Sequence, residues 1–175
     1  MAAIQFFPEQ KLLQSIGFQH RSPLILIIPT LAEDGATEEE ARLDAACVGA
    51  LRTIFSEYYR ERYTRGHSQL LLINMFHEPL RNAMEHGNRS DTGTSVVVGI
   101  WLGSRGVLFA FRDHGDYFSR AEVKKTYESR TLVQSTRLHD PGGYGCVHLY
   151  KAAEDIVVAT AENTLYATYL LKDFS

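Results

Sequence analysis

One stretch of the sequence places oxygen-bearing side chains at the spacing of a helix face. In the segment 78–87, EPLRNAMEHG, Glu78 and Asn82 are four residues apart, and Glu85 or His86 follows. Side chains three or four residues apart lie on the same side of a helix. A carboxylate and a carboxamide oxygen in this arrangement suit a hard cation such as Mg²⁺ and a proton acceptor beside it. A solvated face of an amphipathic helix explains the same pattern, so this cluster alone does not identify a site.

Two glycine-containing turns carry the other candidate residues. Asp113 and Gly115 follow an expected strand, where a carboxylate can hydrogen-bond a flat ligand while glycine lets the backbone approach closely. Gly142, Gly143 and Gly145 open an expected helix, whose free N–H groups and dipole favour a phosphate. Taken singly, the first motif is more typical of a polar turn. The second matches neither the Walker pattern nor the dinucleotide fingerprint.

Hydrophobic periodicity predicts the elements that must position these residues. Strands are expected at residues 24–28, 95–102, 107–112, 155–160 and 164–172, and helices at 37–63, 68–86, 119–129 and between the glycine turn and residue 153. Residues 1–22 give no clear pattern. This order predicts an α/β (α+β) two-layer sandwich, with a mixed, mostly antiparallel sheet and helices on one face.

Pro79 interrupts the helix expected at 68–86. A proline inside a helix removes one backbone hydrogen bond and costs about 3 kcal/mol. Either the helix kinks there, or a new helix begins with Pro79 in its first turn. Gly87 is expected to close the helix as its C-cap glycine.

Composition and charge exclude several classes of protein. The 175 residues predict a single domain over residues 1–175. A formal charge of −3 argues against a broad nucleic-acid surface, so no direct nucleic-acid partner is expected. Cys47 and Cys146 form no paired motif, and Arg81 stands where a zinc-protease HExxH pattern would need histidine.

The sequence also predicts a cytoplasmic protein with no membrane partner. Residues 1–10 lack the basic start of a secretory signal, and the longest apolar stretches, 23–29 and 70–76, are far too short to span a bilayer.

Taken together, the three motifs resemble the ATP-binding signature of the GHKL (histidine kinase-like) ATPase family, with its Bergerat-type fold. The segment Glu78-x-x-x-Asn82-Ala-Met-Glu-His-Gly is similar to the N-box of the anti-sigma factor serine kinases in particular. Asp113-His-Gly115 matches the start of the G1 box, and the Gly142–Gly145 turn matches the G2 box. The resemblance covers about residues 24–171, and the motifs follow one another in the family's order.

The resemblance implies a role for each motif residue. Asn82 would ligate Mg²⁺, and Asp113 would hold the adenine amino group of ATP, with Gly115 allowing close approach of the base. Gly142, Gly143 and Gly145 would offer a backbone cradle to the phosphates. Glu78 stands where the family places the residue that orients or deprotonates the attacking hydroxyl. Residues 116–141 would form a lid whose basic side chains can meet phosphates: Lys124, Lys125, Arg130 and Arg137.

The function that follows is an ATP-dependent protein kinase of the anti-sigma type. It would transfer the γ-phosphate to Ser or Thr of a small antagonist protein, with a sigma factor as a further partner and a homodimer as an assembly that the family allows. Two departures from the family pattern favour an alternative, a non-catalytic docking module of the same fold. Pro79 follows Glu78 directly, and Asp116-Tyr117 replaces the second G1 glycine. A third hypothesis is a histidine kinase domain, which would require a partner chain carrying the phosphoacceptor helix.

Overall fold

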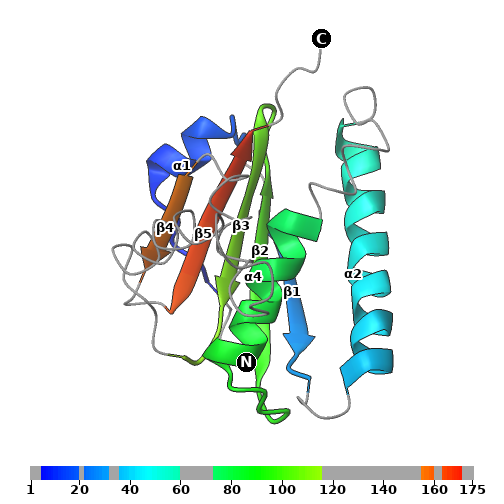
Figure 1. The fold of residues 1–175 in the computed structure, drawn as a ribbon. Helices are drawn as coiled ribbons and strands as arrows, with labels where there is room; N and C mark the ends of the chain where they lie inside the picture. The colour runs from blue at the N-terminus through cyan, green and yellow to red at the C-terminus, as the bar shows by residue number, and fades with distance from the viewer. Residues whose placement is uncertain are drawn as a thin grey trace, which may run out of the picture.

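Five strands of the described residues form one antiparallel sheet in the order β1-β2-β3-β5-β4 (Figure 1). The computed structural model describes residues 5–19, 22–31, 36–59, 73–115, 155–159 and 163–170. The strands are β1 (Leu24–Pro29), β2 (Ser95–Leu102), β3 (Gly106–Arg112), β4 (Asp155–Ala159) and β5 (Thr164–Leu170). The helical elements are α1 (Gln10–Ser15), α2 (Ala36–Tyr59), η1 (Ile73–His77), α4 (Glu78–Asn82) and η2 (Ala83–Gly87).

The strands lie where the sequence predicts them, and the protein has an α+β fold. The β2–β3 hairpin pairs Val97 with Arg112 and Leu102 with Val107. Asn163 takes the left-handed conformation (φ 46°) in the turn before β5. All four strand pairings of the described part are antiparallel. The helix expected at 119–129 and the glycine turn at 142–145 with its helix lie outside the described residues.

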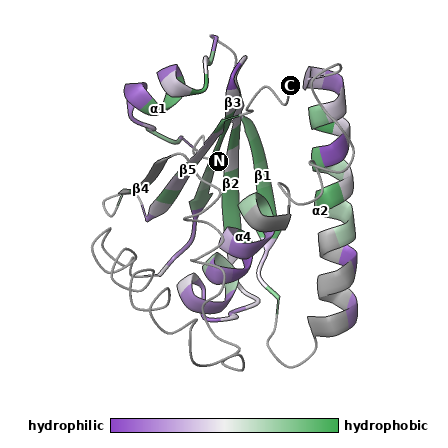
Figure 2. Cartoon of the chain, turned by 45° about the horizontal axis from the view of Figure 1, so that its top comes forward, coloured by the Kyte–Doolittle hydropathy of each residue, from purple (hydrophilic) through white to green (hydrophobic). Residues whose placement is uncertain are grey.

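The main core lies between the sheet and the helices that cover its front face. Alternate residues of β2 and β3, including Val98, Phe109 and Phe111, pack against α2 and the helical segment 73–87. Leu51 and Phe55 of α2 are buried in the same core. Figure 2 shows apolar colouring over the central strands, with polar colouring over α4 and η2. The helical segment therefore buries one side and presents its polar residues on the other.

A short helix covers the opposite face of the sheet, so the expectation of helices on one face is wrong for α1. Leu12 and Ile16 of this region pack with Trp101, Leu108 and Tyr166, whose side chains point away from the main core. Six residues supply too few apolar positions for a periodic signal, which explains why the sequence left this region open.

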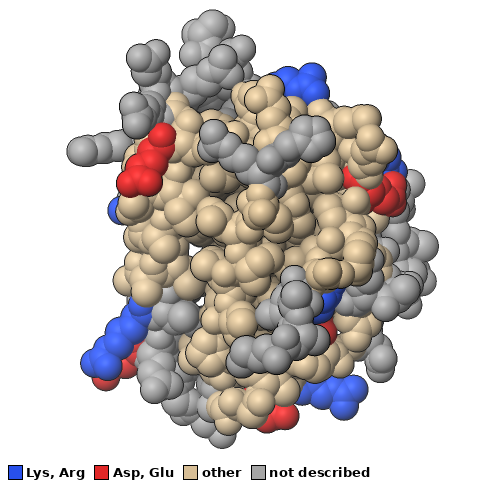
Figure 3. Space-filling model, turned by 180° about the vertical axis from the view of Figure 1, so that it is seen from behind, with Lys and Arg blue, Asp and Glu red and all other residues tan. Residues whose placement is uncertain are grey.

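Seen from behind, charged side chains lie around the margin of a largely uncharged surface (Figure 3). Ile25 and Ile27 of the edge strand β1 are exposed, Ile27 by 61%. No helix in the described ranges combines the length and the apolar character that crossing a bilayer requires.

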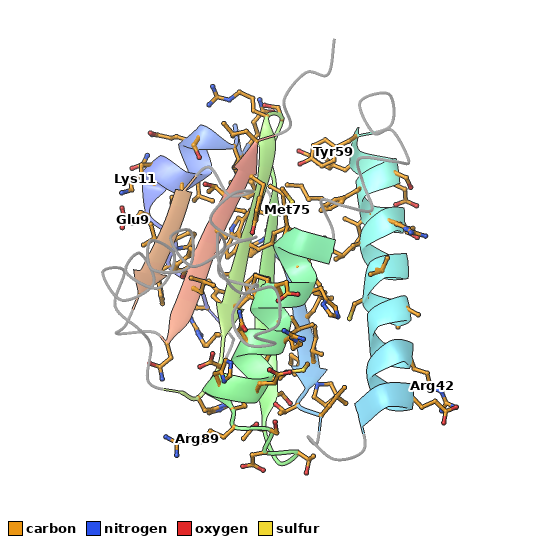
Figure 4. All side chains as sticks on the ribbon, in the orientation of Figure 1. Glu9, Lys11, Arg42, Tyr59, Met75 and Arg89 are labelled. Carbon is orange, nitrogen blue, oxygen red and sulfur yellow. The ribbon has the colours of Figure 1, made fainter. Side chains whose placement is uncertain are left out.

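The β2–β3 turn is held from both faces of the sheet. On the front, the buried Tyr59 hydroxyl at the end of α2 donates between the carbonyl oxygens of Gly103 (3.0 Å) and Gly106 (2.8 Å). Figure 4 shows Tyr59 reaching from α2 toward this end of the sheet. On the back, the N–H of Arg105 donates to the carbonyl of Ile16 at the end of α1 (2.9 Å). Burial raises the pKa of the Tyr59 hydroxyl above its ordinary value of 10.0.

We expect Tyr59→Phe to lower the free energy of unfolding by about 1 kcal/mol, because the two carbonyls lose a buried donor. For a chain of this size that corresponds to a fall of about 2–4 °C in Tm. Urea denaturation measures the change. Arg42→Ala is the control, since it breaks only an exposed ion pair with Glu38 and should change stability by less than about 0.5 kcal/mol. Equal stability of Tyr59→Phe and the wild type would contradict the proposed restraint on the turn.

Candidate functional site

Residues 73–87, here called the site helix, form one helical run in which an α-helical turn lies between two π-helical turns. The run consists of η1, α4 and η2, and α4 begins at Glu78 with Pro79 in its first turn. In a continuous helix the missing N–H of Pro79 leaves the carbonyl of Met75 without its usual donor, and the hydroxyl of Tyr169 donates to that carbonyl (3.4 Å). The backbone is already helical at His77 (φ −62°, ψ −52°), so no new helix begins at Pro79, and the run passes through it with a π-helical turn on either side of α4. Single π-helical turns inside helices occur frequently at functional sites.

Glu78 and Asn82 are the first and last residues of α4, one α-helical turn apart. They share a face of the site helix, as the sequence predicts, and both are half-buried. The Glu78 side chain is 19% exposed, and its buried Oε2 atom accepts no hydrogen bond from any of the described residues. A carboxylate oxygen that accepts no hydrogen bond keeps that capacity for a ligand, a water or a metal-bound water.

Arg81 is a charged neighbour of this pair, and no sequence motif assigns it to the site. Its Nη2 lies 3.5 Å from Oε2 of Glu78, and its Nε lies 3.7 Å from Oε1 of Glu85. The three residues therefore form a loose chain of opposite charges along the site helix. The i, i+3 and i, i+4 spacing in the sequence is the signal that indicates such pairing.

Asp113 stands at the end of β3, the central strand of the sheet, and is only 8% exposed. Its Oδ1 accepts a hydrogen bond from the N–H of Gly115 (2.8 Å), and its own N–H donates to the carbonyl of Asn163 (3.3 Å). The carboxylate thus closes a tight turn over residues 113–115, here called the 113–115 turn. Strand pairing on both sides of β3 gives this turn a rigid support.

The end of the site helix packs directly against the 113–115 turn. A Cβ atom added to Gly87 would overlap the carboxylate of Asp113, and one added to Gly115 would lie 2.6 Å from both the Cα and the carbonyl oxygen of Gly87. Both positions therefore require glycine. At this contact the structure brings the first two sequence motifs together, although Gly87 and Asp113 are 26 residues apart in the chain.

The reason for glycine at position 87 differs from the one expected. Among the described residues, Gly17 is the only glycine with positive φ, so Gly87 does not close the helix in a left-handed conformation. That conformation falls on Arg89 (φ 53°) and Ser90 (φ 54°). The constraint at Gly87 is the close approach of Asp113 and not the backbone dihedral angle.

Asn88, like Arg81, is a site residue that no sequence motif indicates. It is 4% exposed, and its Oδ1 accepts from the N–H of His114 (2.9 Å). Its Nδ2 donates to Oγ1 of Thr30 (2.7 Å), which in turn is 3.1 Å from Oγ1 of Thr94. A buried polar chain thus joins the ends of β1 and the site helix to the 113–115 turn. A single asparagine after His-Gly gives no periodic signal, so only the structure reveals it.

The remaining expected site residues lie outside the described residues. These are Gly142, Gly143 and Gly145, the lid at 116–141 and its basic side chains. His86 and His114 are exposed.

A groove of about 440 Å³ reaches the 113–115 turn from the other side of the sheet, past Val97 and Arg112. Since α1 and the N-terminal segment lie on that side, this groove is separate from the face that carries Glu78 and Asn82.

The site helix offers oxygen donors of the kind that Mg²⁺ accepts. The described residues contain no group of three or more His, Cys, Asp or Glu side chains placed to hold a metal ion. The carboxamide oxygen of Asn82 and the carboxylate of Glu78, which also faces Arg81, stand one turn apart, and a cation that keeps most of its waters needs few protein ligands of this kind. No protein-family model matches the chain, and no curated protein sequence matches it significantly.

We expect Gly87→Ala to destabilise the protein by about 1–3 kcal/mol, because its Cβ needs the space that the Asp113 carboxylate occupies. Gly49→Ala in α2 is the matched control. Nothing lies within 4 Å of a Cβ at Gly49, so this variant should be more stable than the wild type by about 0.5–1 kcal/mol. Urea denaturation compares the two. Similar stability of Gly87→Ala and Gly49→Ala would show that the site helix does not press against Asp113.

Proposed function

We propose that this protein is an ATP-binding regulatory protein of the GHKL type with a Bergerat-type fold, resembling the anti-sigma factor kinases. The observation that carries the proposal is the glycine contact of Gly87 with Asp113 and Gly115. It places the helix motif and the strand-end motif around one position, as a shared nucleotide site requires. The antiparallel sheet with the site helix on its front face supports the same assignment.

In the proposed complex the described residues divide the nucleotide between them. Asp113, buried at the end of β3, accepts a hydrogen bond from the 6-amino group of adenine. Gly115 keeps the backbone low beside the base, and Asn82 supplies a carboxamide oxygen to Mg²⁺. The cation, when bound, neutralises phosphate charge. Gly142, Gly143 and Gly145 are proposed to supply backbone N–H donors to the phosphates.

The proposed reaction is transfer of the γ-phosphoryl group of ATP to a Ser or Thr hydroxyl of a small antagonist protein. The bond between the γ-phosphorus and its bridging oxygen breaks, a bond to the hydroxyl oxygen forms, and ADP leaves. The carboxylate of Glu78 orients that hydroxyl and takes its proton. Phosphoryl transfer asks a protein mainly for positioning and charge neutralisation, which this small set of groups can provide. A sigma factor as a second partner, a homodimer and a cytoplasmic setting belong to the same proposal.

The position of Arg81 favours a second candidate function, a docking module that binds nucleotide without transferring phosphate. Its guanidinium lies 3.5 Å from Glu78 Oε2, so the carboxylate must part from Arg81 before it can take a proton from a hydroxyl. Pro79 and Asp116-Tyr117, the two departures in sequence, point the same way. Nucleotide binding is common to both candidates, and phosphoryl transfer separates them.

We expect Mg-ADP and Mg-ATP to raise the Tm of the wild-type protein. A ligand at a hundredfold excess over its Kd adds about 2.7 kcal/mol to the stability of the folded state, which for this chain length is a shift of several degrees. Asn82→Ala should retain part of the shift and lose its dependence on Mg²⁺, because the proposed metal ligand is gone. Thermal denaturation with and without EDTA measures both effects. The absence of any shift for the wild type would remove the nucleotide-binding proposal.

Transfer is tested by incubating the protein with γ-labelled ATP, Mg²⁺ and a cognate antagonist protein. We expect Glu78→Gln to bind Mg-ATP as the wild type does and to label the antagonist at least about a hundredfold more slowly, since general-base catalysis contributes about 10²–10⁴-fold. Arg81→Gln is the companion variant, because it leaves Glu78 in place and removes the opposing charge. Binding without labelling by the wild type would select the docking module, and equal labelling by Glu78→Gln would exclude Glu78 as the base.

A further inference from the structure

We propose that Asn88 is a positioning residue that fixes the 113–115 turn, so that Asp113 selects a purine carrying a 6-amino group. This inference rests on the proposed nucleotide function and adds to it a determinant of base specificity. Asn88 does not contact the base in this proposal. It acts through the backbone of His114 and, through that backbone, on the direction of the Asp113 carboxylate.

The side chain of Asn88 is committed on both of its ends. Oδ1 accepts from the N–H of His114 at 2.9 Å and lies 3.3 Å from Nδ1 of the same residue. Nδ2 donates to Oγ1 of Thr30 at 2.7 Å. Because the group is 4% exposed, water cannot replace either bond without opening the structure.

The two neighbouring residues at the end of the site helix hold opposite sides of one turn. The bare backbone of Gly87 lies against the Asp113 carboxylate and against Gly115. The side chain of Asn88 holds His114, the residue between them. A third constraint comes from within the turn, where the N–H of Gly115 donates to Oδ1 of Asp113 at 2.8 Å. With Asn88 in place, the direction of the carboxylate is set by all three contacts.

The far end of the network gives Asn88 a fixed anchor. Thr30 follows β1 and is 3% exposed, and Thr94 precedes β2, to which β1 is paired. The N–H of Thr30 donates to the carbonyl of Thr94 at 3.1 Å, so the two threonines are joined by their backbone as well as by their side chains. Asn88 therefore ties the 113–115 turn to the sheet itself, and a merely local packing role would not need this connection.

The test compares Mg-ADP with Mg-IDP, whose base has a 6-oxo group in place of the 6-amino group and a hydrogen on N1. Isothermal titration of the wild type should show at least about a tenfold preference for Mg-ADP, since the carboxylate finds no donor on that position of inosine. Asn88→Ala should bring the ADP/IDP ratio below about threefold, chiefly by weakening Mg-ADP. Thr30→Val, which removes the anchor and keeps Asn88, should lower the ratio to an intermediate value.

A second readout needs no nucleotide. In the nucleotide-free protein, hydrogen exchange at the amide of His114 should be at least about tenfold faster in Asn88→Ala than in the wild type, because the acceptor of that N–H is gone. Tyr59→Phe is the matched control. It removes a buried hydrogen bond at the other end of the sheet, so it should lower stability and leave the ADP/IDP ratio and the His114 exchange rate unchanged.

The outcomes separate the inference from the function on which it rests. If the wild type binds neither nucleotide, the proposed function fails and the inference fails with it. If the wild type prefers Mg-ADP and Asn88→Ala keeps the same ratio, the positioning role alone is overturned. Equal weakening of both nucleotides at an unchanged ratio also overturns it, because that result describes a structural residue. Should Asn88→Ala not fold, the ratio for Thr30→Val decides in the same way.

Discussion

The geometry of the candidate site depends on the absence of a side chain at Gly87. The end of the site helix and the end of β3 approach so closely that any Cβ at this position would enter the space of the Asp113 carboxylate. Two glycines facing each other, Gly87 and Gly115, let backbone meet backbone there. The position of the site helix, with Glu78 and Asn82 on it, relative to the 113–115 turn depends on this contact.

Rigid elements on each side make such a close contact reproducible. Asp113 extends from the central strand β3, which is paired with β2 on one edge and β5 on the other. On the side that faces the sheet, the site helix is held by buried residues that pack into the main core, such as Met75, Phe76 and Leu80. Figure 4 shows Met75 between the site helix and the sheet. Close packing of this kind leaves the polar face of the helix as the part available to a ligand.

The sequence predicts the strands and the shared helix face of Glu78 and Asn82, because alternation and helical spacing are local signals. It predicts the juxtaposition of Asp113 with the site helix only through the order of the motifs. Asn88 and Arg81 were missed, since their contacts depend on tertiary packing or on a side-chain pairing that many helices share. Helix α1 was missed because six residues carry almost no period. The sequence predicts that Gly87 is needed for a left-handed backbone conformation at the helix end. In the structure Gly87 is needed because a Cβ there would overlap the Asp113 carboxylate.

The π-helical turn η2 has a consequence for how this chain can vary in length. It places five residues, Ala83–Gly87, between Asn82 and Asn88 at the pitch of a widened coil. Removing one of them would either close the turn at the narrower α-helical pitch or rotate everything beyond it by about 100°, and both changes alter where the bare backbone of position 87 meets the strand end. Substitutions on the outer side of this coil leave that phase intact. Descendants of this sequence should therefore tolerate exchanges at Glu85 or His86 far more readily than a single-codon deletion between Asn82 and Asn88.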